Sequence, residues 1–172
     1  MEKDEFYNQR VEKAAQLRSE GVPPYAKKYE RTHTTARVSD DFDALSESEA
    51  TVCVAGRMTA VRRMGKASFV DITDDSGKIQ AYFKMNNMGE EKYEIFKKLD
   101  IGDILGVQGK VFKTRTGEVT VVAEDFTLLT KMVLTAWATK TVAGFCSIRN
   151  PREIVFVQPG RGHEAYGAYS PR

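Results

Sequence analysis

The amino-acid sequence predicts an all-β core with flanking helices, in which a five-stranded barrel follows an N-terminal α-helix. Two observations lead to this fold class. Several segments between residues 51 and 131 alternate apolar and polar side chains with a period of two, which is typical of half-buried strands. Clusters of Gly, Asp and Ser separate these segments, and a single segment with helical spacing interrupts them after the third strand.

The chain is expected to begin with a helix over Asp4–Glu20. Asp4 can cap its first turn, and Gly21 with the prolines that follow can end it. Apolar residues recur at three- and four-residue spacing, in Tyr7, Val11, Ala14 and Leu17. This narrow stripe could dock on a small domain. Residues 25–50 are polar and are expected to form a linker, with a short helical segment around Thr34–Leu45.

The segment Ala67–Lys84 is a predicted hairpin, because two alternating arms flank an Asp-Asp-Ser-Gly turn. One face of the hairpin is apolar and should be buried: Val70, Ile72, Ile79, Ala81 and Phe83. On the opposite face Phe69 stands among polar neighbours, with Gln80 and Tyr82 on the paired arm and the rest expected to face solvent. An aromatic ring on a polar sheet face can stack an unpaired base. Alternation alone equally allows Phe69 to lie under a loop or an outer helix.

A first strand over Thr51–Arg63 precedes the hairpin, with Gly56 where the strand must bend. The turn that joins the two carries three positive charges, on Arg62, Arg63 and Lys66. On the rim of a face that displays Phe69, these cations could contact phosphates, although each could also be a simple solvated charge.

The remaining elements are a helix over Met88–Asp100, a strand over Ile104–Lys113, a loop over Thr114–Gly117 and a strand over Glu118–Leu129 that should turn near Glu124. The resulting order of strands and helix is that of the OB-fold, a Greek-key barrel. OB-folds bind oligonucleotides across strands two and three, aided by the loops between strands one and two and between strands four and five. The residues selected by alternation fall on this face, which favours nucleic-acid binding.

Composition sets wide limits on function. The chain has 172 residues, with 26 basic and 24 acidic residues, so bulk charge neither requires nor excludes a nucleic-acid partner. Cys53 and Cys146 are isolated, as are His33 and His163, which indicates neither a disulfide framework nor a zinc site. There is no apolar run of membrane-spanning length and no signal peptide at the start, so no membrane partner and a cytoplasmic location are expected.

Two segments resemble the anticodon-binding domain of class II lysyl-tRNA synthetases. They read GRMTAVRRMGKASFVDITDDSGKIQAYF and LDIGDILGVQGKVFKTRTGEVTV, and LRSEGVPPY at the end of the first helix resembles the start of the same enzymes. The resemblance covers residues 4–131. RRMGKASF and KVFKTRTGE are its specific parts, since the fold alone would also admit aspartyl- and asparaginyl-tRNA synthetases.

The resemblance implies a partner, the uridine-rich anticodon loop of lysine tRNA. By position, Phe69 would stack the central uridine with Arg62 packed near it, and Gln80 and Glu118 would hydrogen-bond the base. A uracil edge offers one N–H donor between two carbonyl acceptors, so a carboxylate with an amide donor can read it. The expected RNA-binding residues are therefore Arg62, Phe69, Gln80 and Glu118, with Arg63 and Lys66 at the rim.

Three parts are expected along the chain: a helix and polar linker over residues 1–50, the OB-fold anticodon-binding domain over 51–131, and an irregular tail over 132–172. The tail lacks the resemblance and is rich in alanine, glycine and aromatic residues. We hypothesise that it is a frameshifted or mispredicted end of a synthetase gene, which reading the encoding DNA in its other frames would test.

The full-length family ligates lysine to tRNA with ATP and Mg²⁺ and forms homodimers through a separate catalytic domain. No part of that domain is recognisable in this sequence. We therefore expect no cofactor, no catalysis and no dimer for the chain alone, only a truncated synthetase module that binds tRNA. The alternatives are a generic single-stranded nucleic-acid-binding OB module and a non-functional gene fragment.

Overall fold

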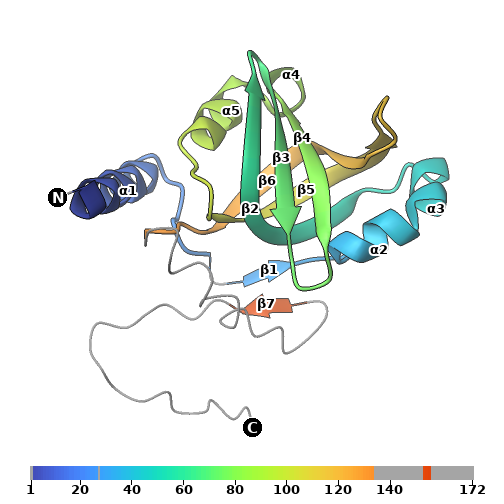
Figure 1. Cartoon of the computed structure of the whole chain (residues 1–172), viewed down its shortest axis with the longest axis horizontal. Coiled ribbons are helices and arrows are strands. Elements are labelled where there is room, and N and C mark those ends of the chain that lie inside the picture. The colour runs from blue at the N-terminus through green and yellow to red at the C-terminus, as the bar shows by residue number, and fades with distance from the viewer. Residues whose placement is uncertain (1, 27, 134–152, 156–172) are drawn as a thin grey trace, which may run out of the picture.

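The structure, a computed structural model, describes residues 2–26, 28–133 and 153–155. Its centre is a closed five-stranded barrel in the order β2-β3-β4-β6-β5 (Figure 1). The strands are β2 (Val52–Met64), β3 (Ala67–Thr73), β4 (Lys78–Lys84), β5 (Ile104–Lys113) and β6 (Val119–Thr130). All neighbours are antiparallel except β4 and β6, which run parallel and close the barrel. The predicted all-β core with flanking helices is confirmed.

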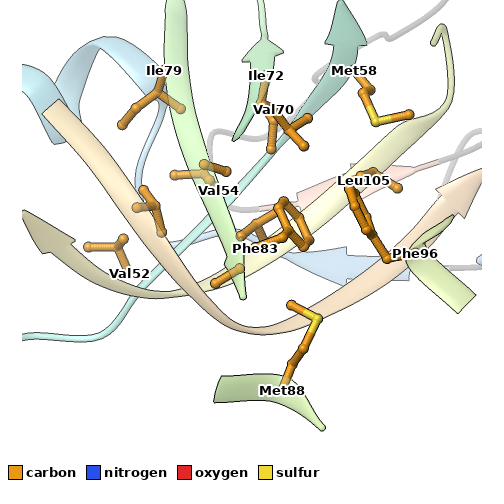
Figure 2. Packing of buried hydrophobic residues seen from close by; sticks show 14 of the residues in the cluster. Val52, Val54, Met58, Val70, Ile72, Ile79, Phe83, Met88, Phe96 and Leu105 are labelled. Atoms are coloured by element: carbon orange, nitrogen blue, oxygen red, sulfur yellow. The ribbon is translucent and has the colours of Figure 1, made fainter. Parts of the chain in front are cut away.

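The barrel interior holds the apolar faces that alternation predicted. Figure 2 shows side chains of this core converging from several strands, among them Val54, Val70, Ile72 and Phe83, each fully buried. Phe83 stacks on Phe96 of helix α5 with ring centroids 4.3 Å apart. The core therefore continues from the barrel into the helices that follow β4.

These helices differ from the prediction of a single helix over Met88–Asp100. The structure has α4 (Met85–Met88) and α5 (Glu90–Lys97), separated by Gly89. Gly89 has φ +87°, a conformation that L side chains rarely adopt and that ends α4.

Strand β2 is long enough to pair with two neighbours. Its first half pairs with β5 and its second half with β3, and Arg57 has a partner in both. At the bend, a Cβ on Gly56 would lie 2.6 Å from the backbone oxygen of Thr73, so only glycine permits this approach. The strand runs on to Met64, so Arg62 and Arg63 lie in β2 itself, and the turn to β3 is confined to residues 65 and 66.

The turn expected near Glu124 is also absent, because β6 continues to Thr130. The register between β5 and β6 shifts between Gln108 and Gly109, whose partners are Asp125 and Ala123. The two consecutive acidic residues that resembled a turn therefore mark a β-bulge, which bends the strand without ending it.

Helix α1 (Glu2–Ser19) begins before Asp4, so that residue is not its N-cap. Of the expected apolar stripe only Leu17 is fully buried, whereas Tyr7 and Val11 are 45% and 40% exposed. Polar contacts hold the helix as well: Lys13 Nζ lies 2.5 Å from Asp100 Oδ1. Of the stripe that could dock on a small domain, the helix therefore buries only the last residue, and cationic side chains add the remaining contacts.

The region between α1 and the barrel is folded, and its predicted helical segment around Thr34–Leu45 is present as two short helices. It forms β1 (Lys28–Glu30), α2 (Thr35–Asp40) and α3 (Phe42–Glu47), with Thr34 capping α2 by accepting from the Arg37 N–H. Both helices contribute to the core, since Val38 is fully buried and Leu45 is 8% exposed. In Figure 1 α2 lies near the β3–β4 turn, and α3 lies farther from that turn.

One part of the tail, expected to be irregular, forms a short strand. Residues Glu153–Val155 are β7, which pairs antiparallel with β1 in a separate two-stranded sheet. Residues 134–152 and 156–172 lie outside the described residues, and with them the rest of the tail to which the frameshift hypothesis applies. No helix in the described part of the chain is long and apolar enough to cross a membrane.

Candidate nucleic-acid interface

The outer face of β2, β3 and β4 carries the candidate site. Phe69 in β3 has Arg62 of β2 as its Cα partner on one side and Tyr82 of β4 on the other. Phe69 is half-buried, and its ring lies 4.7 Å from that of Tyr82 with the planes tilted by 32°. The Tyr82 ring in turn meets Phe112 of β5 edge-on at 6.3 Å. Three aromatic rings from three strands thus form a row, which is the arrangement that stacks unpaired bases.

A buried carboxylate organises the charges beside this row. Asp71 accepts from Arg62 Nη2 at 2.8 Å and from Lys78 Nζ at 3.4 Å. Asp71 is only 7% exposed, although the polar face was expected to look out on solvent. The cations cover the carboxylate, while the Arg62 side chain remains about half exposed, at 51%. Asp71 therefore orients Arg62 beside Phe69 and leaves part of the guanidinium open to a ligand.

A hydrogen-bonded group lies next to the aromatic row, on β4 and at the start of β6. Gln80 Nε2 donates to Glu118 Oε2 at 3.0 Å, and Thr120 Oγ1 donates to Gln80 Oε1 at 3.0 Å. Gln80 is 6% exposed and thus buried, contrary to the expectation for its face, because Thr120 and Glu118 enclose its amide. Glu118 itself is exposed. An amide and a carboxylate held together in this way offer both a donor and an acceptor to a base edge.

The turn before β6 fixes the backbone of Glu118. Its N–H donates to Thr114 Oγ1 at 3.0 Å, and its carbonyl accepts from the Thr114 N–H at 3.0 Å. The carboxylate therefore projects from a turn with little freedom at its base.

The structure separates the two rim residues expected from the first loop. Lys66 lies exposed in the β2–β3 turn. Arg63 has the opposite orientation from Arg62, since its Nη2 donates to the carbonyl of Lys97 in α5 at 3.0 Å. The expectation that Arg63 serves the face of Phe69 is not met, because consecutive residues of a strand point to opposite faces.

Four residues of the site were not selected from the sequence: Asp71, Lys78, Phe112 and Thr120. Alternation places Asp71 on the face of Phe69, which is a signal that could have found it. Thr120 follows Glu118 by two residues and so shares its face, but its contact with Gln80 depends on the parallel pairing of β4 and β6. Among the described residues no group of three or more His, Cys, Asp or Glu could hold a metal ion.

The five-stranded barrel carries an aromatic row across β3, β4 and β5 and the hydrogen-bonded side chains of Gln80, Glu118 and Thr120 beside it. These features define an OB-fold of the nucleic-acid-binding class. Residues 52–129 match the protein family described as OB-fold nucleic acid binding domain. The chain is thus an OB-fold protein, with the barrel as its central domain.

Similarity to individual proteins identifies the family more closely. The chain is 49% identical over 128 residues to lysine–tRNA ligase of Pelotomaculum thermopropionicum, covering 74% of this chain and 25% of that protein. It is 49% identical over 130 residues to the enzyme of the same name from Carboxydothermus hydrogenoformans, covering 76% and 26%. For that of Enterococcus faecalis the identity is 47% over 127 residues, covering 71% and 26%. The chain spans about a quarter of the length of these relatives. It is homologous to the lysine–tRNA ligases and carries their anticodon-binding OB domain.

Proposed function

We propose that the outer face of β2–β4 binds the anticodon loop of lysine tRNA and reads the uridine at its centre. The observation that carries this proposal is the placement of Phe69 on the same face as the hydrogen-bonded pair Gln80 and Glu118. The relatives are lysine–tRNA ligases, which supports lysine tRNA as the source of the loop.

The contacts between these residues suggest how a uracil base is read. Phe69 supplies a ring on which the base stacks. Gln80 Nε2 has two hydrogens, and only one of them donates to Glu118, so the other can donate to a uracil carbonyl. Glu118 accepts at Oε2, which leaves Oε1 to accept from the uracil N–H. Single-stranded loops are the form of RNA in which these edges are accessible.

Cations supply the part of binding that does not depend on sequence. Arg62 is held beside Phe69 by Asp71, and Lys66 is exposed in the neighbouring turn. Both can approach the phosphates that flank a stacked base, so affinity should decrease as salt rises.

A generic single-strand-binding module is the second candidate. The row of Phe69, Tyr82 and Phe112 favours it, because every base has a face that can stack on such rings. It predicts equal binding of different bases and gives no role to Glu118. Ligation of lysine to tRNA with ATP and Mg²⁺ is a proposal for a protein of the full length of the relatives, and we assign no step of it to the residues described here.

The test is a titration of this chain with a lysine tRNA anticodon stem-loop, and with the same loop carrying cytidine in place of the central uridine, at one moderate salt concentration. We expect tighter binding of the uridine loop. In Phe69→Ala that binding should weaken by about 5- to 150-fold, since a stacked base contributes about 1–3 kcal/mol. Phe6→Ala is the matched control, because Phe6 lies on α1 and is already 59% exposed.

Equal binding of the two loops would contradict anticodon reading and favour the generic module. Loss of binding in the control as well as in Phe69→Ala would contradict a specific role for the Phe69 ring.

A further inference from the structure

Thr120 occupies a buried position behind the residues proposed to read the base. It has 0% exposure, lies near the start of β6 and is the Cα partner of Gln80 across the parallel pair of β4 and β6. It therefore does not touch the ligand, and it contacts the site through Gln80.

The hydroxyl of Thr120 has one hydrogen and two acceptors within reach. The nearer acceptor is Gln80 Oε1 at 3.0 Å, and the other is the backbone oxygen of Glu118 at 3.3 Å. The bond to Gln80 occupies the carbonyl oxygen of the amide and thereby directs its nitrogen toward Glu118 and the base. Because Gln80 is 6% exposed, water can replace this bond only poorly.

In the free protein Glu118 also favours this amide orientation. A reversed amide would place Gln80 Oε1 against Glu118 Oε2, two acceptors at the 3.0 Å that now separates donor and acceptor. The bond from Thr120 to the amide oxygen and the bond from the amide nitrogen to Glu118 therefore fix the same orientation from the two ends of the amide.

The orientation of the amide decides which pyrimidine fits. Uracil presents a carbonyl oxygen at C4 and accepts from the amide nitrogen, whereas cytosine presents an amino group there and needs an acceptor. With its oxygen bound to Thr120, Gln80 can serve uracil and cannot readily turn its oxygen toward cytosine.

We propose that Thr120 is a positioning residue that sets the preference for uridine over cytidine by fixing the amide of Gln80. This inference rests on the proposed function, since it concerns the same base.

The experiment measures the ratio of affinities for the uridine and cytidine stem-loops in wild type and in Thr120→Val, which keeps the shape of the side chain and removes the hydroxyl. The ratio should fall on the order of fivefold, the value of one net hydrogen bond. Thr120→Ser should restore it. Thr127→Val is the control on the same strand, because Thr127 is exposed. Thr120→Ala removes the same hydroxyl and takes the place of Thr120→Val if that variant does not fold.

The outcomes distinguish a failure of the role proposed for Thr120 from a failure of the proposed function. A wild-type chain that binds both loops equally overturns the proposed function and the role of Thr120 together. A wild-type preference that persists in Thr120→Val overturns the role of Thr120 alone. An equal loss of affinity for both loops, with the ratio unchanged, shows a purely structural residue and overturns it as well.

Discussion

Replacing Lys131 by methionine should strongly destabilise the barrel. Lys131 follows β6 directly and is a fully buried cation. Its Nζ lies 2.6 Å from Asp100 Oδ2 and 2.8 Å from Asp103 Oδ2, and Asp103 is fully buried too. Asp103 also accepts from the backbone N–H of Asp100 and of Met132. Methionine fills a similar volume but leaves the carboxylate of Asp103 without its cation.

The size of the effect follows from this burial. Removal of one partner from a buried ion pair costs about 3–5 kcal/mol, because the remaining charge is left uncompensated. The free energy of unfolding of a small domain falls by about 1–3 kcal/mol for each molar of urea. The midpoint of urea unfolding should therefore fall by about 2 M in Lys131→Met.

Urea titration followed by circular dichroism measures this shift, and Lys92→Met is the control. Lys92 lies 2.7 Å from Asp125, but both side chains are 47% exposed, and such surface pairs contribute about 0–1 kcal/mol. A midpoint for Lys131→Met within the range of the control would refute the view that this buried pair stabilises the fold. The same result would contradict the expectation that Lys131→Met leaves the Asp103 carboxylate with an uncompensated charge.

Two further predictions concern the bulge and the β3–β4 turn. Gly109→Ala should destabilise the barrel by about 1–3 kcal/mol or more, because its Cβ would lie 1.7 Å from the backbone oxygen of Val122. Gly77→Ala is the control, since the atom nearest to its Cβ would be 3.6 Å away. Equal urea midpoints for the two variants would contradict the prediction. Burial by itself raises the pKa of Asp74, but hydrogen bonds from Thr35 and from the turn outweigh it and hold the pKa below 3.8. Asp74 therefore stabilises the fold above that pH, and this stabilisation is lost as the pH falls through the pKa of Asp74 in the folded state. In Asp74→Asn the free energy of unfolding should decrease less between about pH 6 and pH 2 than in wild type. An unchanged slope would contradict this role of Asp74.

Strands with strict alternation were predictable from the sequence. The bounds of β5 match the prediction of Ile104–Lys113, because Leu105, Val107 and Val111 fall on one face of the segment. The end of β6 was not predictable, since Glu124 and Asp125 resemble a turn and only pairing with Gly109 shows a bulge. Burial of Val38 and Leu45 was missed for a related reason: single apolar residues in a polar segment give no period, and only the barrel provides their contacts.

The candidate site shows the same division. Phe69 was found because an aromatic residue broke the polar pattern of its face, a signal contained in a few consecutive residues. Arg63 was misplaced because Arg62 and Arg63 were assigned together to the turn, whereas both lie in β2, where consecutive side chains point to opposite faces. Asp71 and Thr120 were missed because they act through hydrogen bonds to neighbouring strands, and these contacts depend on register.

The hydrogen bonds within the proposed site favour selectivity over affinity. Gln80 and Glu118 already bind each other without RNA, and Arg62 already binds Asp71, so these groups are held in fixed orientations before a base arrives. A uracil edge fits the positions that remain, because it supplies both an acceptor for the second amide hydrogen and a donor for the second carboxylate oxygen. A base that lacks the N–H leaves Glu118 facing another acceptor, and an unmade hydrogen bond costs more than a made one contributes. The pairs present before binding therefore penalise the wrong base more than they assist the right one.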